Sequence, residues 1–200
     1  MTARLRATLL GLGLALLPAA LAGCGTTAPS SFYTLDAAAT AADGPPVAAA
    51  VIVGPVSVPA AVDRPEFVVS IGPNEVAIDE FHRWASPLGD AIARTVAGDL
   101  AVLLGTPEVA TGPLANFRPN YRVTISVQRF ESARGDAALV EAVWAVRATA
   151  GGAPRTGRTL AREPVQGEGY AALAAAHSRA LATLSADVAQ AIRSEIGQKR

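Results

Sequence analysis

Several residue types on which common enzymes and metal proteins depend are scarce in this 200-residue sequence. The single cysteine, Cys24, cannot form an internal disulfide. Neither of the two histidines, His82 and His177, has a second histidine or a cysteine at metal-ligand spacing. The only lysine is Lys199, and the sequence contains no Gly-x-x-x-x-Gly-Lys-Ser/Thr or Gly-x-Ser-x-Gly motif. The sequence therefore offers no metal centre, no nucleotide phosphate loop and no serine-hydrolase nucleophile.

Polar residues that could act as catalysts stand in positions typical of ordinary structure. His177 falls within the apolar stripe of the last predicted helix, which favours a packed core histidine over a ligand. Asp79 and Glu80 are adjacent, and such pairs are usually solvated rather than opposed across a cleft as glycoside hydrolysis requires. We therefore expect no enzyme activity, no catalytic residue and no metal or diffusible cofactor.

The charge of the chain excludes another class of partner. The first 23 residues hold two arginines and no acidic residue, so residues 24–200 carry 15 basic and 17 acidic side chains and a net charge of −2. A nucleic-acid-binding protein needs a basic patch or stripe. A helix lying on a membrane surface needs lysine and arginine along one face. We expect no nucleic-acid partner.

Residues 1–23 have the organisation of a secretory signal peptide. Arg4 and Arg6 precede an apolar run over residues 9–17, which Pro18 closes. The alternative is a transmembrane helix, but the run is shorter than the roughly 20 residues that a bilayer span needs. The pattern favours an exported protein.

The signal peptide ends in Leu21-Ala22-Gly23-Cys24, which resembles the lipobox of bacterial lipoproteins. The resemblance implies cleavage before Cys24 and a diacylglyceryl group on its thiol, which is the one covalent lipid that we expect. A free thiol and an intermolecular disulfide are the alternatives. Lipoprotein sorting in many Gram-negative bacteria retains proteins with Asp after the cysteine at the inner membrane. Because Gly25 stands there, we expect the periplasmic face of the outer membrane rather than the inner membrane.

The mature chain divides into a tether and one domain. Residues 24–46 are rich in Ala, Gly, Thr, Ser and Pro, and as flexible coil they would span about 25 Å. One apolar island, Phe32–Leu35, could dock as a strand and shorten that reach. Residues 47–200 are enough for a single domain with one core.

Residues 47–200 alternate between strand and helix patterns. Strands are predicted over residues 47–58, 66–71, 75–78, 121–130, 139–148 and 156–166, with either a bulge or the end of a strand near Gln128 and Arg129. Helices are predicted over 88–104 and 170–197, the first with Ser86 as cap, Pro87 at the first helical position and Gly105 as the stop. The predicted fold is an α+β single domain, with a mainly antiparallel sheet covered on one face by two helices.

A set of motifs in one order covers nearly the whole mature chain. The motifs are Phe32–Leu35, Gly54–Pro59, Val62–Pro65, Phe81–Leu88, Tyr121–Phe130, Trp144 and Tyr170–Leu173. Together, after a lipobox, they resemble the PqiC-like auxiliary lipoproteins of ABC-type transport systems. The resemblance implies phospholipid transport between the inner and outer membranes, and as partners an MCE-domain protein with an ABC permease and ATPase. The resemblance does not decide whether the protein forms a homo-oligomer.

The same motifs supply the candidate partner contacts. Asp63, Arg64, His82, Arg83 and Trp84 are expected in loops at one edge of the domain, where they could contact the transport partner. A purely structural interpretation stands beside this one. In it, Trp84 packs the start of the first helix and Arg64 pairs with a nearby carboxylate. A lipoprotein that scaffolds a cell-wall enzyme or an outer-membrane assembly machine is the alternative function.

The lipobox interpretation predicts the behaviour of one variant. Cys24→Ala removes the thiol that would carry the lipid, so the protein should move from the membrane fraction to the soluble periplasmic fraction. Ultracentrifugation of fractionated cells with immunodetection measures this. A variant that still sediments with the membranes would contradict the lipid anchor.

Overall fold

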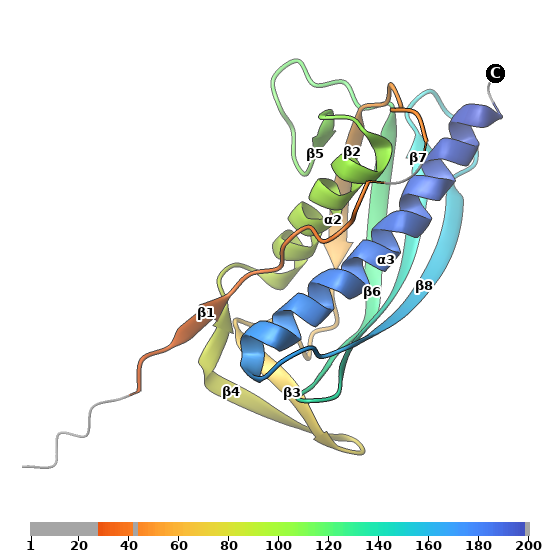
Figure 1. The fold of residues 1–200 in the computed structure, drawn as a ribbon. Coiled ribbons are helices and arrows are strands. Elements are labelled where there is room, and N and C mark those ends of the chain that lie inside the picture. Colours follow the sequence, from red (N-terminus) through yellow and green to blue (C-terminus); the bar gives the residue numbers. More distant parts are fainter. Residues whose placement is uncertain (1–27, 42–43, 199–200) are drawn as a thin grey trace, which may run out of the picture.

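The structure is a computed structural model that describes residues 28–41 and 44–198. The predicted signal peptide and Cys24 lie outside the described residues. Within them, two helices lie against one face of a five-stranded sheet, and a smaller three-stranded sheet extends from one end of the molecule (Figure 1). This confirms the predicted α+β single domain with two helices on one face. The strands form two mixed sheets.

The larger sheet has the strand order β5-β2-β6-β7-β8. Strands β6, β7 and β8 form an antiparallel meander, whereas β2 runs parallel to both β5 and β6. The pairing of β6 with β7 shifts between Val127 and Arg129, which confirms the predicted bulge near Gln128 rather than the end of the strand. The strands are β2 (Val51–Ser57), β5 (Val109–Ala110), β6 (Tyr121–Ala133), β7 (Ala137–Ala148) and β8 (Arg155–Pro164).

The smaller sheet has the order β1-β4-β3 and comprises β1 (Ser31–Tyr33), β3 (Glu66–Gly72) and β4 (Glu75–Trp84). Strands β3 and β4 form the predicted hairpin, called here the hairpin arm, and Asn74 takes the positive φ of 60° that its turn requires. Strand β1 adds to β4 in parallel. His82, Arg83 and Trp84 therefore lie on a strand, and the expectation that they lie in a loop is wrong, because β4 is longer than the residues 75–78 predicted.

The two helices have nearly the predicted bounds, α2 at Leu88–Leu104 and α3 at Gly169–Gly197. Helix α2 ends at Gly105, whose φ of 66° is left-handed and favours glycine. The expected cap by Ser86 is wrong. Pro87 occupies the N-cap position without a side-chain cap, and the Ser86 hydroxyl accepts a hydrogen bond from Arg94 Nη2.

The core lies between the helices and the larger sheet. The helices contribute apolar side chains spaced three or four residues apart, and the sheet contributes alternate residues of its central strands. Trp144 of β7 lies over Gly157 of β8, where a Cβ atom would approach the indole ring to 2.2 Å. Fully buried core residues include Leu88, Ile92, Leu100, Val123, Leu173, Leu181 and Leu184.

The segment before β2 is packed on the domain. Residues 24–46 were expected to form a flexible tether, but the described chain from Ser31 to Ala41 crosses the two helices (Figure 1). Leu35 is buried in the core, and a Cβ on Gly98 of α2 would come within 2.9 Å of the Ala37 methyl. Residues 31–41 therefore belong to the packed domain, and the apolar island Phe32–Leu35 overlaps its first strand, β1.

A buried carboxylate holds this segment in place. Asp99 of α2 is fully buried, and its Oδ1 accepts hydrogen bonds of 2.8 Å from the amides of Ala38 and Ala39. Its Oδ2 accepts a 3.0 Å bond from the Ser185 hydroxyl of α3. Burial raises the pKa of Asp99, and the three hydrogen bonds oppose that rise. One side chain thus joins the N-terminal segment to both helices.

Replacing Asp99 tests this arrangement. Asp99→Ala leaves the amides of Ala38 and Ala39 without their acceptor, whereas the Ser185 hydroxyl keeps the Leu181 carbonyl, and it should lower the free energy of unfolding by about 3 kcal/mol. Asp99→Asn keeps an acceptor for the two amides and adds a donor for Ser185, so its loss should stay within about 1 kcal/mol. Urea unfolding of the chain without its signal peptide measures both values. Equal losses in the two variants would contradict the role of the hydrogen bonds.

Candidate functional site

Two of the motifs meet around one cavity at the start of α2. The loop between β2 and β3 contributes Asp63, Arg64 and Pro65, and the connection from β4 into α2 contributes residues 84–88. The cavity has a volume of about 380 Å³, with apolar walls and charged side chains at its rim. Such a mixture suits the docking of an apolar side chain next to polar groups.

Backbone hydrogen bonds fix the loop that lines this cavity. The amides of Val62 and Asp63 both donate to the Pro59 carbonyl, and the Trp84 amide donates to the Pro65 carbonyl at 2.7 Å. The loop is therefore attached to the end of β4. These backbone hydrogen bonds fix the position of the cavity rim.

Ion pairs surround the rim. Glu66 is shared between Arg64, with Nε–Oε2 at 3.9 Å, and Arg83, with Nη2–Oε1 at 3.4 Å. Arg64 therefore has the nearby carboxylate that the structural interpretation expects. Both arginine side chains are more than one third exposed, so these pairs add little stability and leave the guanidinium groups accessible.

Trp84 forms a wall of the cavity and also belongs to the core. Its indole stacks on Phe67 with ring centroids 4.0 Å apart, and it meets the edges of Phe130 and His177 at 6.0 and 6.2 Å. It is 5% exposed. This packing joins the hairpin arm to β6 and α3, and the packing of Trp84 on the start of α2 stays a prediction.

His82 does not line the cavity. Its ring stacks on Tyr170 of α3 with centroids 4.0 Å apart, and its Nδ1 lies 2.9 Å from Asp79 Oδ1. Of the five predicted contact residues, the structure brings Asp63, Arg64 and Trp84 together. Arg83 joins them through Glu66.

The sequence missed the polar cluster in which His82 takes part. Tyr170 Oη donates to Asp79 Oδ2 at 2.6 Å, and the amides of Phe81 and His82 donate to Asp79 Oδ1. Burial alone would raise the pKa of Asp79, but the hydrogen bonds from Tyr170, His82 and Phe81 lower it to about 2. Burial and the Asp79 carboxylate raise the pKa of Tyr170 to about 12. Asp79 is therefore a structural acceptor instead of one of two solvated carboxylates.

His177 is the packed core histidine that the sequence favours. It is fully buried, stacks on Phe130 with centroids 3.9 Å apart, and its Nε2 lies 2.8 Å from Ser132 Oγ. Burial lowers its pKa to about 3, so the imidazole is neutral near pH 7. No group of three potential metal-ligating side chains occurs among the residues that the structure describes.

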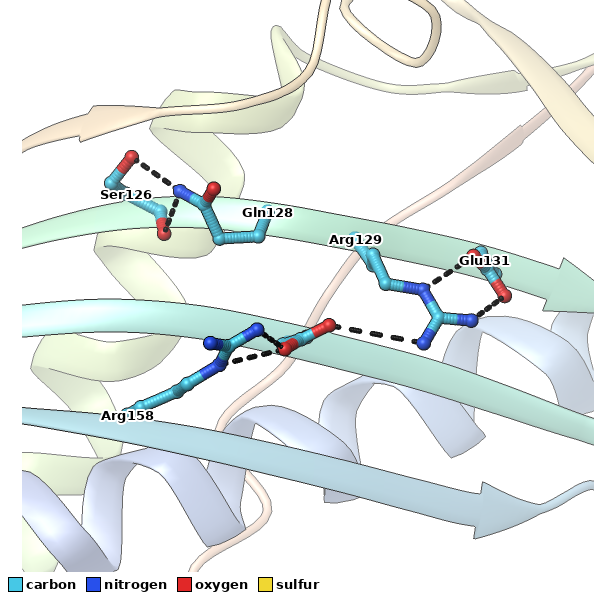
Figure 2. A network of polar contacts seen from close by, with 6 residues as sticks. Ser126, Gln128, Arg129, Glu131 and Arg158 are labelled. Atoms are coloured by element: carbon cyan, nitrogen blue, oxygen red, sulfur yellow. Dashed lines mark hydrogen bonds and ion pairs between the residues drawn. The ribbon is translucent and has the colours of Figure 1, made fainter.

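The helix-free face of the larger sheet carries a second polar network, which the sequence did not predict (Figure 2). Glu141 of β7 is largely buried on this face between Arg129, whose Nη1 lies 3.8 Å from Oε2, and Arg158, which hydrogen-bonds to Oε1. Arg129 also pairs with Glu131 of its own strand at 2.7 Å. The network pairs two arginines with two glutamates, so its charges cancel.

The site is a partly apolar cavity bordered by ion-paired side chains on an α+β domain. Comparisons with known proteins identify the family of this domain. The model of the ABC-type transport auxiliary lipoprotein component family matches residues 33–189, and the chain belongs to this family. A comparison with curated proteins gives no match. No helix among the described residues is both long enough and apolar enough to cross a bilayer.

Solved structures share the fold. An uncharacterized protein has a TM-score of 0.68 and 21% identity, covering 82% of this chain and 99% of that one. A protein from Xanthomonas campestris, of the family model DUF330, has a TM-score of 0.67 and 21% identity, covering 85% of this chain and all of its own. PelC from Paraburkholderia phytofirmans, a dodecamer, has a TM-score of 0.37 and 17% identity over 74% of this chain and 92% of its own. The first two show the fold of this chain.

The buried histidine predicts a pH dependence. His177 has a folded-state pKa near 3 against 6.5 for the unfolded chain, so the unfolded state takes up a proton first and stability falls as the pH drops below 6.5. Between pH 7 and pH 5 this costs about 2 kcal/mol of unfolding free energy. In His177→Gln that loss should disappear. Urea unfolding at both pH values measures it, and an unchanged pH dependence in the variant would contradict a neutral buried imidazole.

Proposed function

We propose that this protein is the non-enzymatic, lipid-anchored auxiliary component of an MCE/ABC-type phospholipid transport system that operates between the inner and outer membranes. In this proposal Cys24 carries the lipid, and the domain stands on the periplasmic face of the outer membrane. The single observation that supports it best is the cavity beside α2, which is lined by two stretches that both lie within the family match over residues 33–189.

The composition of the cavity favours a protein partner. Trp84, Pro87 and Leu88 give it apolar walls, and the exposed guanidinium of Arg64 stands at the rim. An interface of this kind buries an apolar side chain in a pocket and surrounds it with polar contacts. We infer that a segment of the MCE-domain protein docks here, with an apolar residue in the cavity and a carboxylate near Arg64.

The size of the cavity argues against a carrier of lipid. About 380 Å³ holds one or two side chains, which is too small for both acyl chains of a phospholipid. The interior between helices and sheet is filled by fully buried side chains. In this proposal the protein therefore positions other components of the transporter and does not carry lipid itself.

Affinity capture tests the proposal. The full-length protein with a C-terminal tag is purified from detergent-solubilised membranes, and we expect an MCE-domain protein, a permease and an ATPase to copurify. Arg64→Glu reverses the charge at the rim and should reduce their recovery by about tenfold, since one desolvated charge pair at an interface contributes on that scale.

Arg147→Glu is the matched control, because Arg147 is an exposed arginine on the helix-free face of β7. Its recovery should equal that of the wild type. Loss in the control but not in Arg64→Glu would contradict docking at the cavity. Recovery of only a cell-wall synthase or an outer-membrane barrel protein would contradict the transport function.

A further inference from the structure

Large exposed apolar side chains are concentrated at one end of the molecule. Nine such side chains occur among the described residues, and five of them belong to the three short strands of the smaller sheet. The other four, Val102, Leu114, Val143 and Leu160, are scattered over four different segments. We name the five the hairpin patch: Phe32, Ile71, Val76, Ile78 and Phe81.

The side chains of the hairpin patch are far more exposed than is usual for Phe, Ile and Val, which are mostly buried in proteins. Phe32 is 64% exposed, and Ile71 and Val76 on either side of the hairpin turn are each 57% exposed. Isolated exposed apolar residues are normal on a protein surface, but a group of large ones on a projecting hairpin marks an interaction surface.

The hairpin patch lies at the end where the chain enters the domain. Strand β1 pairs with the last residues of β4, so Phe32 belongs to the same sheet as the hairpin arm, and Figure 1 places this sheet at the end away from the C-terminus. Phe32 follows Cys24 by eight residues. Eight residues reach at most about 29 Å when fully extended. Any lipid on Cys24 therefore keeps this sheet close to the bilayer.

The charges around the hairpin patch indicate what kind of surface it fits. Its acidic neighbours Glu75 and Glu80 are exposed, Arg134 lies beside Ile71, Ile78 and Phe81, and Arg83 pairs with Glu66. Among these described residues, the two exposed carboxylates outnumber the one arginine that has no acidic partner. The hairpin arm is thus not cationic and gains nothing from an anionic lipid surface. Apolar contact with a zwitterionic phospholipid surface remains favourable, and the two carboxylates keep the arm at the headgroup level.

We propose that the hairpin patch lies against the phospholipid surface of the membrane that holds the anchor, as a second attachment beside the lipid. The proposal rests on the lipid anchor that the proposed function places on Cys24. Two attachments, unlike one flexible lipid, fix how the domain stands on the membrane. The smaller sheet then faces the bilayer, and the C-terminal end of α3 points away from it (Figure 1).

Chemical anchoring tests this independently of lipoprotein processing. The mature chain from Cys24 is coupled through its only thiol to a maleimide lipid in phosphatidylcholine vesicles that contain a photoactivatable diazirine phosphatidylcholine. After irradiation, mass spectrometry of peptides locates the labelled residues. Label should concentrate in peptides from β1, β3 and β4, about tenfold above peptides from β8.

The test variant carries Ile71→Thr, Val76→Thr and Ile78→Thr, which remove apolar surface and keep β-branched side chains in the strands. Its labelling in these peptides should fall by about tenfold. The matched control, Val143→Thr with Leu160→Thr, removes exposed apolar side chains from β7 and β8 and should label like the wild type. Circular dichroism checks that both variants are folded.

Three outcomes would overturn the proposal. They are label spread evenly over the domain, label unchanged in the hairpin variant, and protection of hairpin amides that rises with protein concentration in the absence of vesicles. The last would show that a second copy of the chain covers the hairpin patch. Because coupling is chemical, a failure here leaves lipidation and transport untouched. Retention of Cys24→Ala on cell membranes would instead count against the anchor.

Discussion

The buried carboxylate of Asp99 constrains the whole molecule. A carboxyl group enclosed between two helices needs hydrogen-bond partners, and the amides of Ala38 and Ala39 supply two of them. Their position requires the N-terminal segment to lie across α2 and α3, and that path ends in β1 beside β4. The exit of the chain toward Cys24 is therefore set at the hairpin arm.

A second constraint connects the smaller sheet to the candidate site. Phe67 and Trp84 stack between the hairpin arm and the core, and Trp84 is at the same time a wall of the cavity. A side chain so deeply buried supports the walls of the cavity. In the proposed function, partner contact would fall to the exposed rim, where Arg64 pairs with Glu66, the carboxylate that it shares with Arg83.

Local patterns in the sequence predicted much of the fold. The apolar spacing of residues 88–104 and 170–197 predicted α2 and α3, and Gly105 marked the end of the first. A change of alternation predicted a bulge or a strand end near Gln128, and the structure has the bulge. The sequence did not predict the Asp79–Tyr170 bond or the Arg129–Glu141–Arg158 network, because their members lie on different strands and helices. It named Asp63, Arg64 and Trp84, but not the cavity they share.

The sequence by itself determined the features that depend on near neighbours: the secretory pattern before Cys24, the scarcity of catalytic motifs and the helices and strands of an α+β domain. Only the tertiary structure decided that residues 31–41 pack on the helices, that His82 faces Tyr170 and not the cavity, and that five of the nine large exposed apolar side chains of the described residues share one end. Periodicity and turn residues act within a few positions of the chain. The packing of residues 31–41 and the rim of the cavity depend on surfaces that exist only after elements distant in the sequence have packed.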